Sequence, residues 1–269
     1  MKNVLLLIHD DEGQEARFQA ALEVARALNG HVTCLDLTVI PEYVGHYAAI
    51  GEAGMLLTAD HDAEQRHGRR MRIRMENEDV PFDWLEQTGF LAQTIEGRAR
   101  LTDLIVLSTD DAREMYPYMT HVLGDVLVHT GKPVLAMPPS VRRLDVGGSA
   151  LVAWDGSQDA EAALAAALPL LQHASSVTIF YVDDGSLATT AEDAACYLSR
   201  HGVRSTVRSE PVGYDQVGEW LICEAAGRGY DYIVMGGFGH ARTMEAIFGG
   251  VTRKMLKDCQ VPMLLVHRR

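Results

Sequence analysis

Positive charge is in short supply in this sequence. Its 269 residues include 24 Lys and Arg against 37 Asp and Glu, which gives a net charge of −13. Nucleic-acid phosphates are held by clustered Lys and Arg, and this chain does not concentrate them, so we expect no nucleic-acid partner. With 23% charged and 47% hydrophobic residues, the composition is that of a globular protein that can bury a core.

Long apolar runs and paired cysteines are also missing. The N-terminal apolar run Val4–Ile8 stops at His9 and the acidic Asp10–Glu12, far short of a signal sequence or a membrane span. We therefore expect a cytoplasmic protein with no membrane association. The four cysteines show no Cys-x-x-Cys spacing and lie in apolar segments, which favours buried, reduced thiols over disulfides or a zinc site: Cys34, Cys196, Cys223 and Cys259.

Common catalytic motifs do not occur either. There are eleven histidines but no His-Glu-x-x-His, and His61 and His67 are spaced so that they fall on different faces of a helix. We expect the histidines to be exposed to solvent. No Gly-x-Ser-x-Gly elbow is found, and Ser157, which follows Asp155-Gly156, is expected to cap a helix instead of acting as a nucleophile.

The most informative stretch runs from Asp231 to Thr252. The apolar run Tyr232–Met235 predicts a buried strand, and Val251–Lys257 predicts a helix. Glycines stand at the end of the strand and at the start of the helix: Gly236, Gly237, Gly239, Gly249 and Gly250. Glycine lets backbone N–H groups approach a ligand, and a helix N-terminus adds free donors and partial positive charge. A tight turn explains any one of these glycines, but the group as a whole favours a phosphate cradle.

Two familiar phosphate motifs do not fit this stretch. Gly249-Gly250 is not followed by the Lys-Ser/Thr of a Walker loop, and Arg242 stands where a dinucleotide fingerprint needs its third small residue. The spacing from Gly236 through Gly239 to Gly249 instead resembles the nucleotide-binding signature of the universal stress protein family, Gly-x2-Gly-x9-Gly-(Ser/Thr). Gly250 stands where the family carries Ser or Thr, which removes one hydroxyl contact to phosphate but keeps the backbone N–H.

The chain contains two diverged copies of one unit. The first copy opens with a strand over Asn3–Ile8, a helix over Glu15–Leu28 closed by Asn29-Gly30, and a strand over Val32–Val39. The second opens with a strand over Ala150–Trp154, a helix over Asp159–Gln172 and a strand over Val177–Val182. The copies also close alike, since Asp103–Leu107 matches Asp231–Met235 and Lys132–Ala136 matches Val261–Leu265.

This repeat predicts two α/β domains, residues 1–140 and 145–269, joined by a linker over residues 138–148. Strands that are apolar throughout indicate parallel sheets covered by helices on both faces. The universal stress protein family includes tandem fusions, and the resemblance implies two open parallel-sheet domains of the adenine nucleotide alpha hydrolase-like, Rossmann type.

The signature fits only the second copy. Ser108 and Asp111 stand where the second copy has Gly236 and Gly239, and the acidic pair Asp110-Asp111 would repel phosphate. We therefore interpret the first copy as a degenerate site. The first copy is longer near Pro41–Thr58, where apolar residues favour packing between the halves over a ligand pocket. Thr58–Glu78 follows as a charged helix with a solvated face.

The resemblance also implies a ligand and the residues that hold it. The ligand is ATP, or ADP or AMP, and Mg²⁺ accompanies the phosphates. Asp155, which ends the first strand of the second copy, lies with Ala153 and Val182 around the base and ribose, although Asp155 could instead serve only to cap the turn. The predicted nucleotide contacts are Ala153, Asp155, Val182, Met235, Gly236, Gly239, Gly249, Gly250, Val251 and Thr252.

The expected role is nucleotide-dependent regulation or stress resistance. We expect no catalytic residue, and at most a weak ATPase activity. Pairing of family domains implies that the two halves pack about a pseudo-two-fold axis, and further assembly into a homodimer is expected on the resemblance alone. Two alternatives stay open. One is a nucleotide hydrolase or adenylyl-transfer enzyme that uses His240 and Arg242, and the other is a binder of a non-nucleotide molecule in the N-terminal half.

Overall fold

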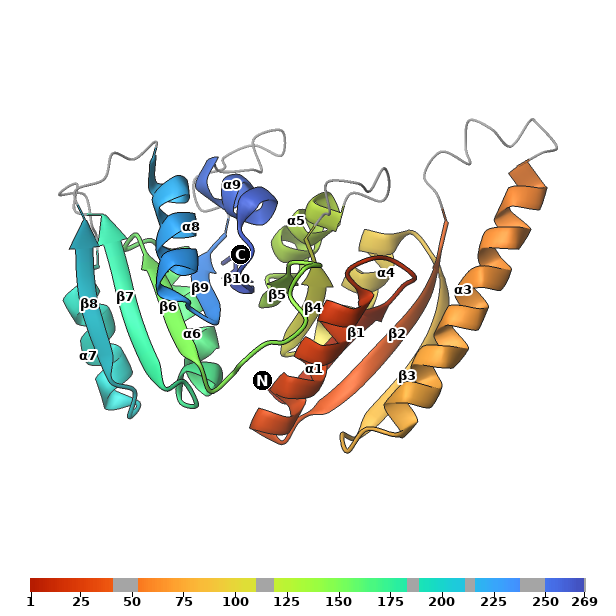
Figure 1. Ribbon diagram of the computed structural model, residues 1–269, viewed down its shortest axis with the longest axis horizontal. Coiled ribbons are helices and arrows are strands. Elements are labelled where there is room, and N and C mark those ends of the chain that lie inside the picture. Colours follow the sequence, from red (N-terminus) through yellow and green to blue (C-terminus); the bar gives the residue numbers. More distant parts are fainter. Residues whose placement is uncertain (41–52, 110–118, 183–188, 211–215, 238–249, 269) are drawn as a thin grey trace.

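The computed structural model describes residues 1–40, 53–109, 119–182, 189–210, 216–237 and 250–268, without the side chains of residues 53–62 (Figure 1). Across these ranges, ten strands form a single sheet that is covered by helices on both faces. The α/β architecture predicted from the repeat is therefore confirmed.

The strands are β1 Asn3–Ile8, β2 His31–Val39, β3 Phe82–Gly89, β4 Leu104–Ser108, β5 Val134–Met137, β6 Ser149–Trp154, β7 Ser176–Val182, β8 Ser205–Glu210, β9 Tyr232–Gly236 and β10 Met263–Val266. The helices are α1 Gln14–Leu28, α3 Ala53–Glu76, α4 Leu91–Arg98, α5 Met119–Thr130, α6 Gln158–Leu171, α7 Ala191–Arg200, α8 Val217–Arg228 and α9 Gly250–Asp258, with a short 3₁₀ helix at Ala99–Leu101.

The strand order is β3-β2-β1-β4-β5-β10-β9-β6-β7-β8. All neighbours are parallel except the central pair, β5 and β10, which is antiparallel. Read outward from that pair, the two halves have the same order of strands, as two copies related by a two-fold axis would. The halves therefore do pack together as predicted, and they do so by sharing one continuous sheet.

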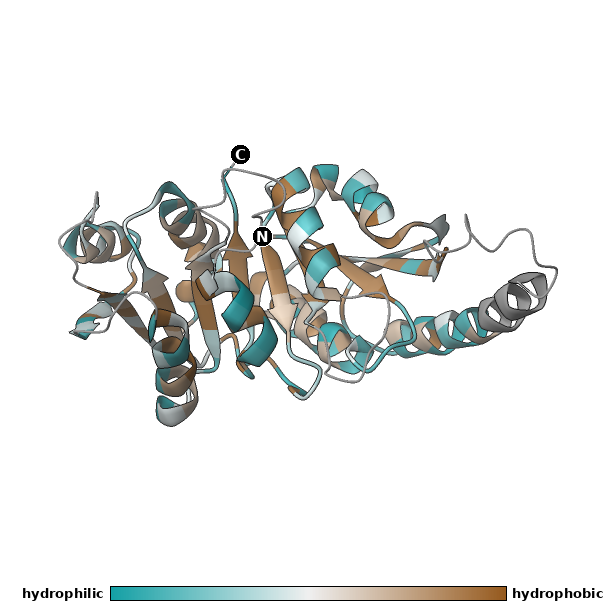
Figure 2. Ribbon diagram, turned by 90° about the horizontal axis from the view of Figure 1, so that it is seen from above, coloured by the Kyte–Doolittle hydropathy of each residue, from teal (hydrophilic) through white to brown (hydrophobic). Residues whose placement is uncertain are grey.

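Each face of the sheet carries one hydrophobic core that spans both halves. One core packs under α1, α3, α6 and α7 and includes Phe18, Leu164 and Leu198. The other packs under α4, α5, α8 and α9 and includes Leu123 and Met255. Figure 2 shows the hydrophobic strands enclosed between helices whose hydrophilic residues lie on the outside. This layering follows from strands that are apolar on both faces.

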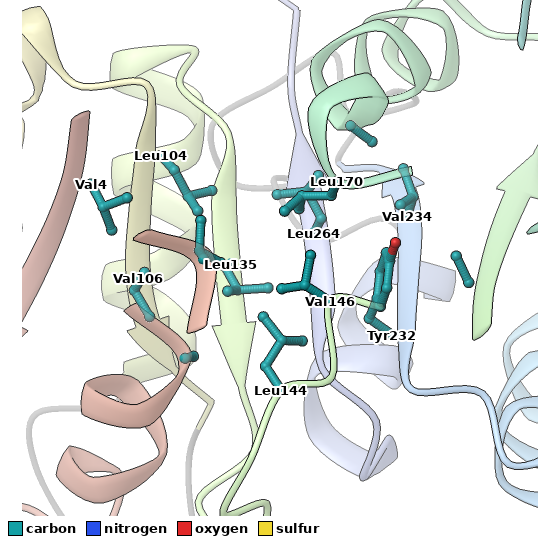
Figure 3. Packing of buried hydrophobic residues seen from close by; sticks show 14 of the residues in the cluster. Val4, Leu104, Val106, Leu135, Leu144, Val146, Leu170, Tyr232, Val234 and Leu264 are labelled. Atoms are coloured by element: carbon teal, nitrogen blue, oxygen red, sulfur yellow. The ribbon is translucent and has the colours of Figure 1, made fainter. Parts of the chain in front are cut away.

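The linker between the halves is part of the core. Leu144 and Val146 are buried beside Leu135 of β5 and Leu264 of β10 (Figure 3). On the other face, a Cβ added at Gly237 would lie 2.8 Å from a methyl group of Leu127 in α5. Both sides of the central strand pair are thus closely packed.

Local sequence explains where several helices begin and end. Ser157 caps α6 as predicted, because its hydroxyl accepts the N–H of Ala160 at 3.1 Å. Thr190 and Asp193 form a capping box at the start of α7. Helix α1 ends at Asn29, which adopts a left-handed conformation with φ of 49° and is followed by Gly30, as the Asn-Gly pair predicted.

Three expectations need correction. Cys34 and Cys259 are buried free thiols, but Cys196 and Cys223 are exposed free thiols, because each occupies the outer face of its helix. The expectation of exposed histidines is wrong for His9 and for His67, whose side chains are largely buried. The charged helix α3 begins before Thr58, and it buries His67 against the first half.

Other expectations meet the limits of the described structure. Residues 41–52, which hold most of the apolar insert in the first copy, lie outside the described ranges. Among the helices that are described, none is both long enough and apolar enough to cross a membrane.

Candidate functional site

In the second half, the chain reverses its direction of winding at β6. Strand β6 lies between β7 and β9. Helix α6 connects it to β7 on one side, and the chain later returns through β8 and α8 to β9 on the other side. In open parallel sheets, ligands bind beyond the carboxyl ends of the strands at such a switch point. The carboxyl ends of β6 and β9 are therefore the candidate site.

Four of the predicted nucleotide contacts lie on one face of this edge. Ala153, Val182, Met235 and Val251 all pack on the face covered by α8 and α9. Ala153 lies between Phe180 and Met235 in the register of the sheet. It is only partly buried although it lies in the middle of the sheet.

Asp155 follows β6 and is exposed at the same edge. Its Oδ1 accepts the N–H of Ser157 at 3.0 Å, and Gly156 between them has φ of 67°. One carboxylate oxygen thus closes the turn into α6, which is the simpler of the two roles expected for Asp155. A contact to a bound ribose remains a prediction.

Gly236 has a packing role at the end of β9. A Cβ added there would lie 2.8 Å from the backbone N of Ala160 and 2.9 Å from Asp159. Real side chains do not approach a backbone so closely, so any other residue would push α6 away from the strand. The first glycine of the signature is therefore needed for packing, whether or not a phosphate also lies near it.

Asp159 and His267 were not predicted from the sequence, although they brace this edge. Asp159 is buried in the first turn of α6, where its Oδ1 accepts the N–H of Arg268 at 2.6 Å and lies 3.2 Å from His267 Nδ1. That same ring nitrogen lies 3.1 Å from the carbonyl oxygen of Gly237. An aspartate two residues after a capping serine is the signal that could have indicated Asp159.

The phosphate end of the predicted site is described only in part. Gly250 begins α9, and no atom of another described residue would lie within 4 Å of a Cβ added to it. Thr252 is only 6% exposed. Gly239 and Gly249 lie outside the described residues, as do His240 and Arg242 of the alternative enzymatic hypothesis.

At the equivalent edge of the first half, beyond β1 and β4, Arg17 lies on the face covered by α1. Its side chain is fully buried, and the guanidinium donates to the carbonyl oxygens of Leu7 and His9, both at 3.2 Å. It also donates to Asp11 at 2.8 Å and to the Ser108 hydroxyl at 2.6 Å. These contacts brace the strand ends on the face covered by α1, which corresponds to the α6 face of the second half. Asp110 and Asp111, on which the degenerate-site hypothesis partly rested, lie outside the described residues.

The two halves place their glycine on opposite sides of the same contact. In the first half the strand ends in Ser108, and the neighbouring helix supplies the glycine, because a Cβ at Gly13 would lie 2.4 Å from Ser108 Cβ. In the second half the strand supplies the glycine at Gly236. One of the two partners must lack a side chain for helix and strand to meet.

The fold and this edge define a tandem α/β protein of the Rossmann type. The sequence model of the universal stress protein family matches residues 149–267. Matching solved structures include a universal stress protein from Archaeoglobus fulgidus DSM 4304, with a TM-score of 0.74 and 16% identity over 99% of this chain and 96% of that one. A putative universal stress protein from Pseudomonas aeruginosa UCBPP-PA14 has a TM-score of 0.61 and 14% identity over 99% and 93%.

A further solved structure, from the universal stress protein family of Burkholderia pseudomallei, is 30% identical over 45% of this chain and 97% of its own, with a TM-score of 0.34. A search of curated proteins finds no match. The chain belongs to the universal stress protein family and carries two of its domains in tandem.

Proposed function

We propose that the chain binds an adenine nucleotide at the carboxyl edge of β6 and β9 and acts through it in regulation or stress resistance. The observation that carries this proposal lies on the face covered by α8 and α9. There Ala153 is partly exposed, and no atom of another described residue would lie within 4 Å of a Cβ added to Gly250.

The described residues fit such a ligand. Ala153 and Val182 offer an apolar surface for the base, and the exposed Asp155 lies where a ribose hydroxyl could donate to it. Helix α9 begins at Gly250, and its N-terminus would donate backbone N–H groups to a phosphate. Gly239, Gly249 and Thr252 complete the phosphate contacts in this proposal, and Mg²⁺ would be held mainly through phosphate oxygens.

A cytoplasmic location and a homodimer belong to the same proposal. Both rest on the resemblance of the sequence to its family. A sedimentation mass of one chain at micromolar concentration would remove the homodimer and leave the internal pairing of the halves intact.

Titration of the intact chain with Mg·ATP tests the nucleotide site. We expect one nucleotide per chain, and we expect Gly249→Val to abolish binding while unfolding remains cooperative, because the added side chain occupies the phosphate's space. Gly97→Val is the matched control, since Gly97 lies in α4 of the first half with open space around it. It should bind like the parent.

The outcomes separate the possibilities clearly. Equal binding by the parent and by Gly249→Val would contradict the phosphate cradle. Two sites of similar affinity would contradict a degenerate first half. Recovery of a nucleotide hydrolysis product, instead of intact ATP, would favour the enzymatic alternative.

A further inference from the structure

A cavity lies in the first half, far along the sheet from the nucleotide edge. It has a volume of about 490 Å³ and is lined by residues of α3 and of the outer strands β2 and β3, three elements that Figure 1 shows side by side. That volume is within the range of about 300–1,000 Å³ found for small-molecule sites. All of its lining residues are in the described part of the chain.

Two carboxylates lie side by side in this cavity. Asp36 of β2 and Glu86 of β3 are direct partners in the register of the sheet, and both line the cavity. Adjacent like charges on neighbouring strands repel each other. Burial and the charge of Glu86 raise the pKa of Asp36 from 3.8 to about 6, and a hydrogen bond from Trp84 offsets only part of this rise.

Asp36 has no cationic partner among the described residues. Its carboxylate instead lies against the backbone of α3, since a Cβ added at Gly68 would be 2.1 Å from Asp36 Oδ2. Glu86 has only a distant partner, because Arg72 Nη1 is 3.9 Å away and Arg72 also pairs with Glu76. The acid pair is therefore short of positive charge.

Helix α3 supplies the opposite charge at the rim of the cavity. Arg69 lines the cavity and is exposed, and no described carboxylate lies within ion-pairing distance of it. The cavity thus presents an acid pair with an aromatic ring, Trp84, on the sheet side and an uncommitted guanidinium on the helix side.

We propose that this cavity binds a small zwitterion of the amino-acid class. Its ammonium group lies against Asp36 and Glu86, and its carboxylate pairs with Arg69. An ammonium relieves the repulsion within the acid pair and can lie over the Trp84 ring, whereas an anion at that end would add to the repulsion. A planar guanidinium is well suited to a carboxylate.

Calorimetric titration of the intact chain tests this assignment with defined probes. The probes are the common L-amino acids, putrescine as a pure cation, and butyrate as a pure anion. We expect at least one amino acid to bind one per chain, putrescine to bind about tenfold or more weakly, and butyrate not to bind.

Three variants assign the two ends of the ligand. Asp36→Asn should weaken amino-acid binding by at least about tenfold, since a charge-assisted contact is lost. Arg69→Gln should weaken amino acids similarly and leave putrescine unchanged. Asp83→Asn is the matched control, because it removes one acid from the neighbouring strand β3 outside the cavity lining. It should bind like the parent.

Asp36→Asn is also expected to keep or raise the melting temperature of the unliganded chain, because it removes a repelled carboxylate. A loss of binding therefore cannot be attributed to unfolding. The proposal is overturned if no amino acid binds, if butyrate binds as well as the best amino acid, or if Asp36→Asn and the parent bind equally. Binding of Mg·ATP in the other half is measured separately, so the two proposals can fail independently.

Discussion

The glycines near the candidate site are needed for different physical reasons, and the sequence alone does not distinguish these reasons. Gly236 faces the backbone of α6, Gly237 faces Leu127, and Gly250 faces open space. The sequence motif treats the glycines as one phosphate cradle. The structure assigns a packing role to the first two and leaves Gly250 available to a ligand.

The contact between strand and helix in the first half can be tested by a double-mutant cycle. Gly13→Ala should destabilise the parent by roughly 1–3 kcal/mol, because its Cβ would overlap Ser108. In the Ser108→Gly background the same substitution should cost less than about 0.5 kcal/mol. Gly13 has φ of −84°, so backbone strain does not contribute.

Urea unfolding of the four proteins in this cycle gives the coupling free energy. Ser108→Gly alone should also be destabilising, because it removes the acceptor of Arg17 Nη1. If Gly13→Ala reduced the free energy of unfolding equally in both backgrounds, the close approach of residue 13 to residue 108 would not require a glycine at either position.

Gly250→Ser restores the residue that the family signature carries. Because no atom of another described residue lies within 4 Å of the added Cβ, folding stability should change by less than about 0.5 kcal/mol. Nucleotide affinity should be unchanged or improve by roughly 1 kcal/mol, the contribution of one hydrogen bond. A clear loss of affinity in the Mg·ATP titration would show that Gly250 is needed for its backbone conformation.

Buried polar residues mark the limit of prediction from this sequence. Arg17 lies on an amphipathic helix where a charged side chain is expected to face water, yet it is fully buried. Its burial depends on acceptors from β1, from the loop before α1 and from β4, which come together only in the folded sheet. The local sequence pattern contains no information about contacts between segments that are far apart in the sequence.

At the scale of elements, the apolar strands were predictable and the polar ones were not. Strands β1, β6 and β9 are continuous apolar runs, and their predicted bounds agree with the structure to within one residue. Strand β8, Ser205–Glu210, is polar because it forms the outer edge of the sheet, and its residues contain no apolar run from which a strand could be predicted. The phosphate loop lies outside the described residues, so that part of the site remains a prediction.

Helix α3 is attached to the first half through contacts between basic side chains and carboxylates. His9 Nδ1 lies 2.8 Å from Glu64, His67 Nδ1 lies 3.0 Å from Asp10, and Arg74 lies 2.7 Å from Glu15. The same helix forms one wall of the Asp36 cavity. Its attachment therefore affects the shape of that cavity.

The two histidines under α3 respond to pH in opposite directions. Burial alone would lower the pKa of His9, but its contact with the Glu64 carboxylate outweighs burial and raises the pKa above 6.5. His9 thus stabilises the fold below pH 6.5, and this stability is lost as the pH rises through its folded-state pKa. For His67, burial lowers the pKa, so His67 opposes folding as the pH falls.

Glu64→Gln separates these effects. At about pH 6 the variant should be less stable than the parent by roughly 1–3 kcal/mol, because protonated His9 loses its partner in a largely buried position. The difference should shrink at about pH 9, where His9 is neutral in both proteins. The exposed Glu76→Gln on the same helix is the control and should change stability by less than about 1 kcal/mol at either pH. A Glu64→Gln deficit that is independent of pH, measured by urea unfolding, would contradict the assigned role of His9.

At the scale of the whole molecule, the repeat predicted two domains, and the structure joins them through one sheet. Met263, Leu264 and Leu265 pair with Ala136, Leu135 and Val134 across the centre. The pairing covers an edge strand of each half, and an uncovered edge would be free to pair with another chain. This central pairing was anticipated only as internal packing of the two halves, since register and direction depend on contacts far apart in the sequence.

The linker makes this joining testable. Leu144 lies in the segment between the halves and is 1% exposed, with its side chain beside Leu135 and Val146 (Figure 3). Leu144→Ala leaves a cavity at the centre of the sheet and should destabilise the intact chain by roughly 2–5 kcal/mol. Because the core on this face is continuous across both halves, we expect one cooperative unfolding transition that shifts as a whole. Leu101→Ala removes the same atoms at a position that is 90% exposed and should change stability by less than about 0.5 kcal/mol. Calorimetry that resolves two transitions, with Leu144→Ala moving only one or neither, would show that the halves fold independently and that the linker is only a tether.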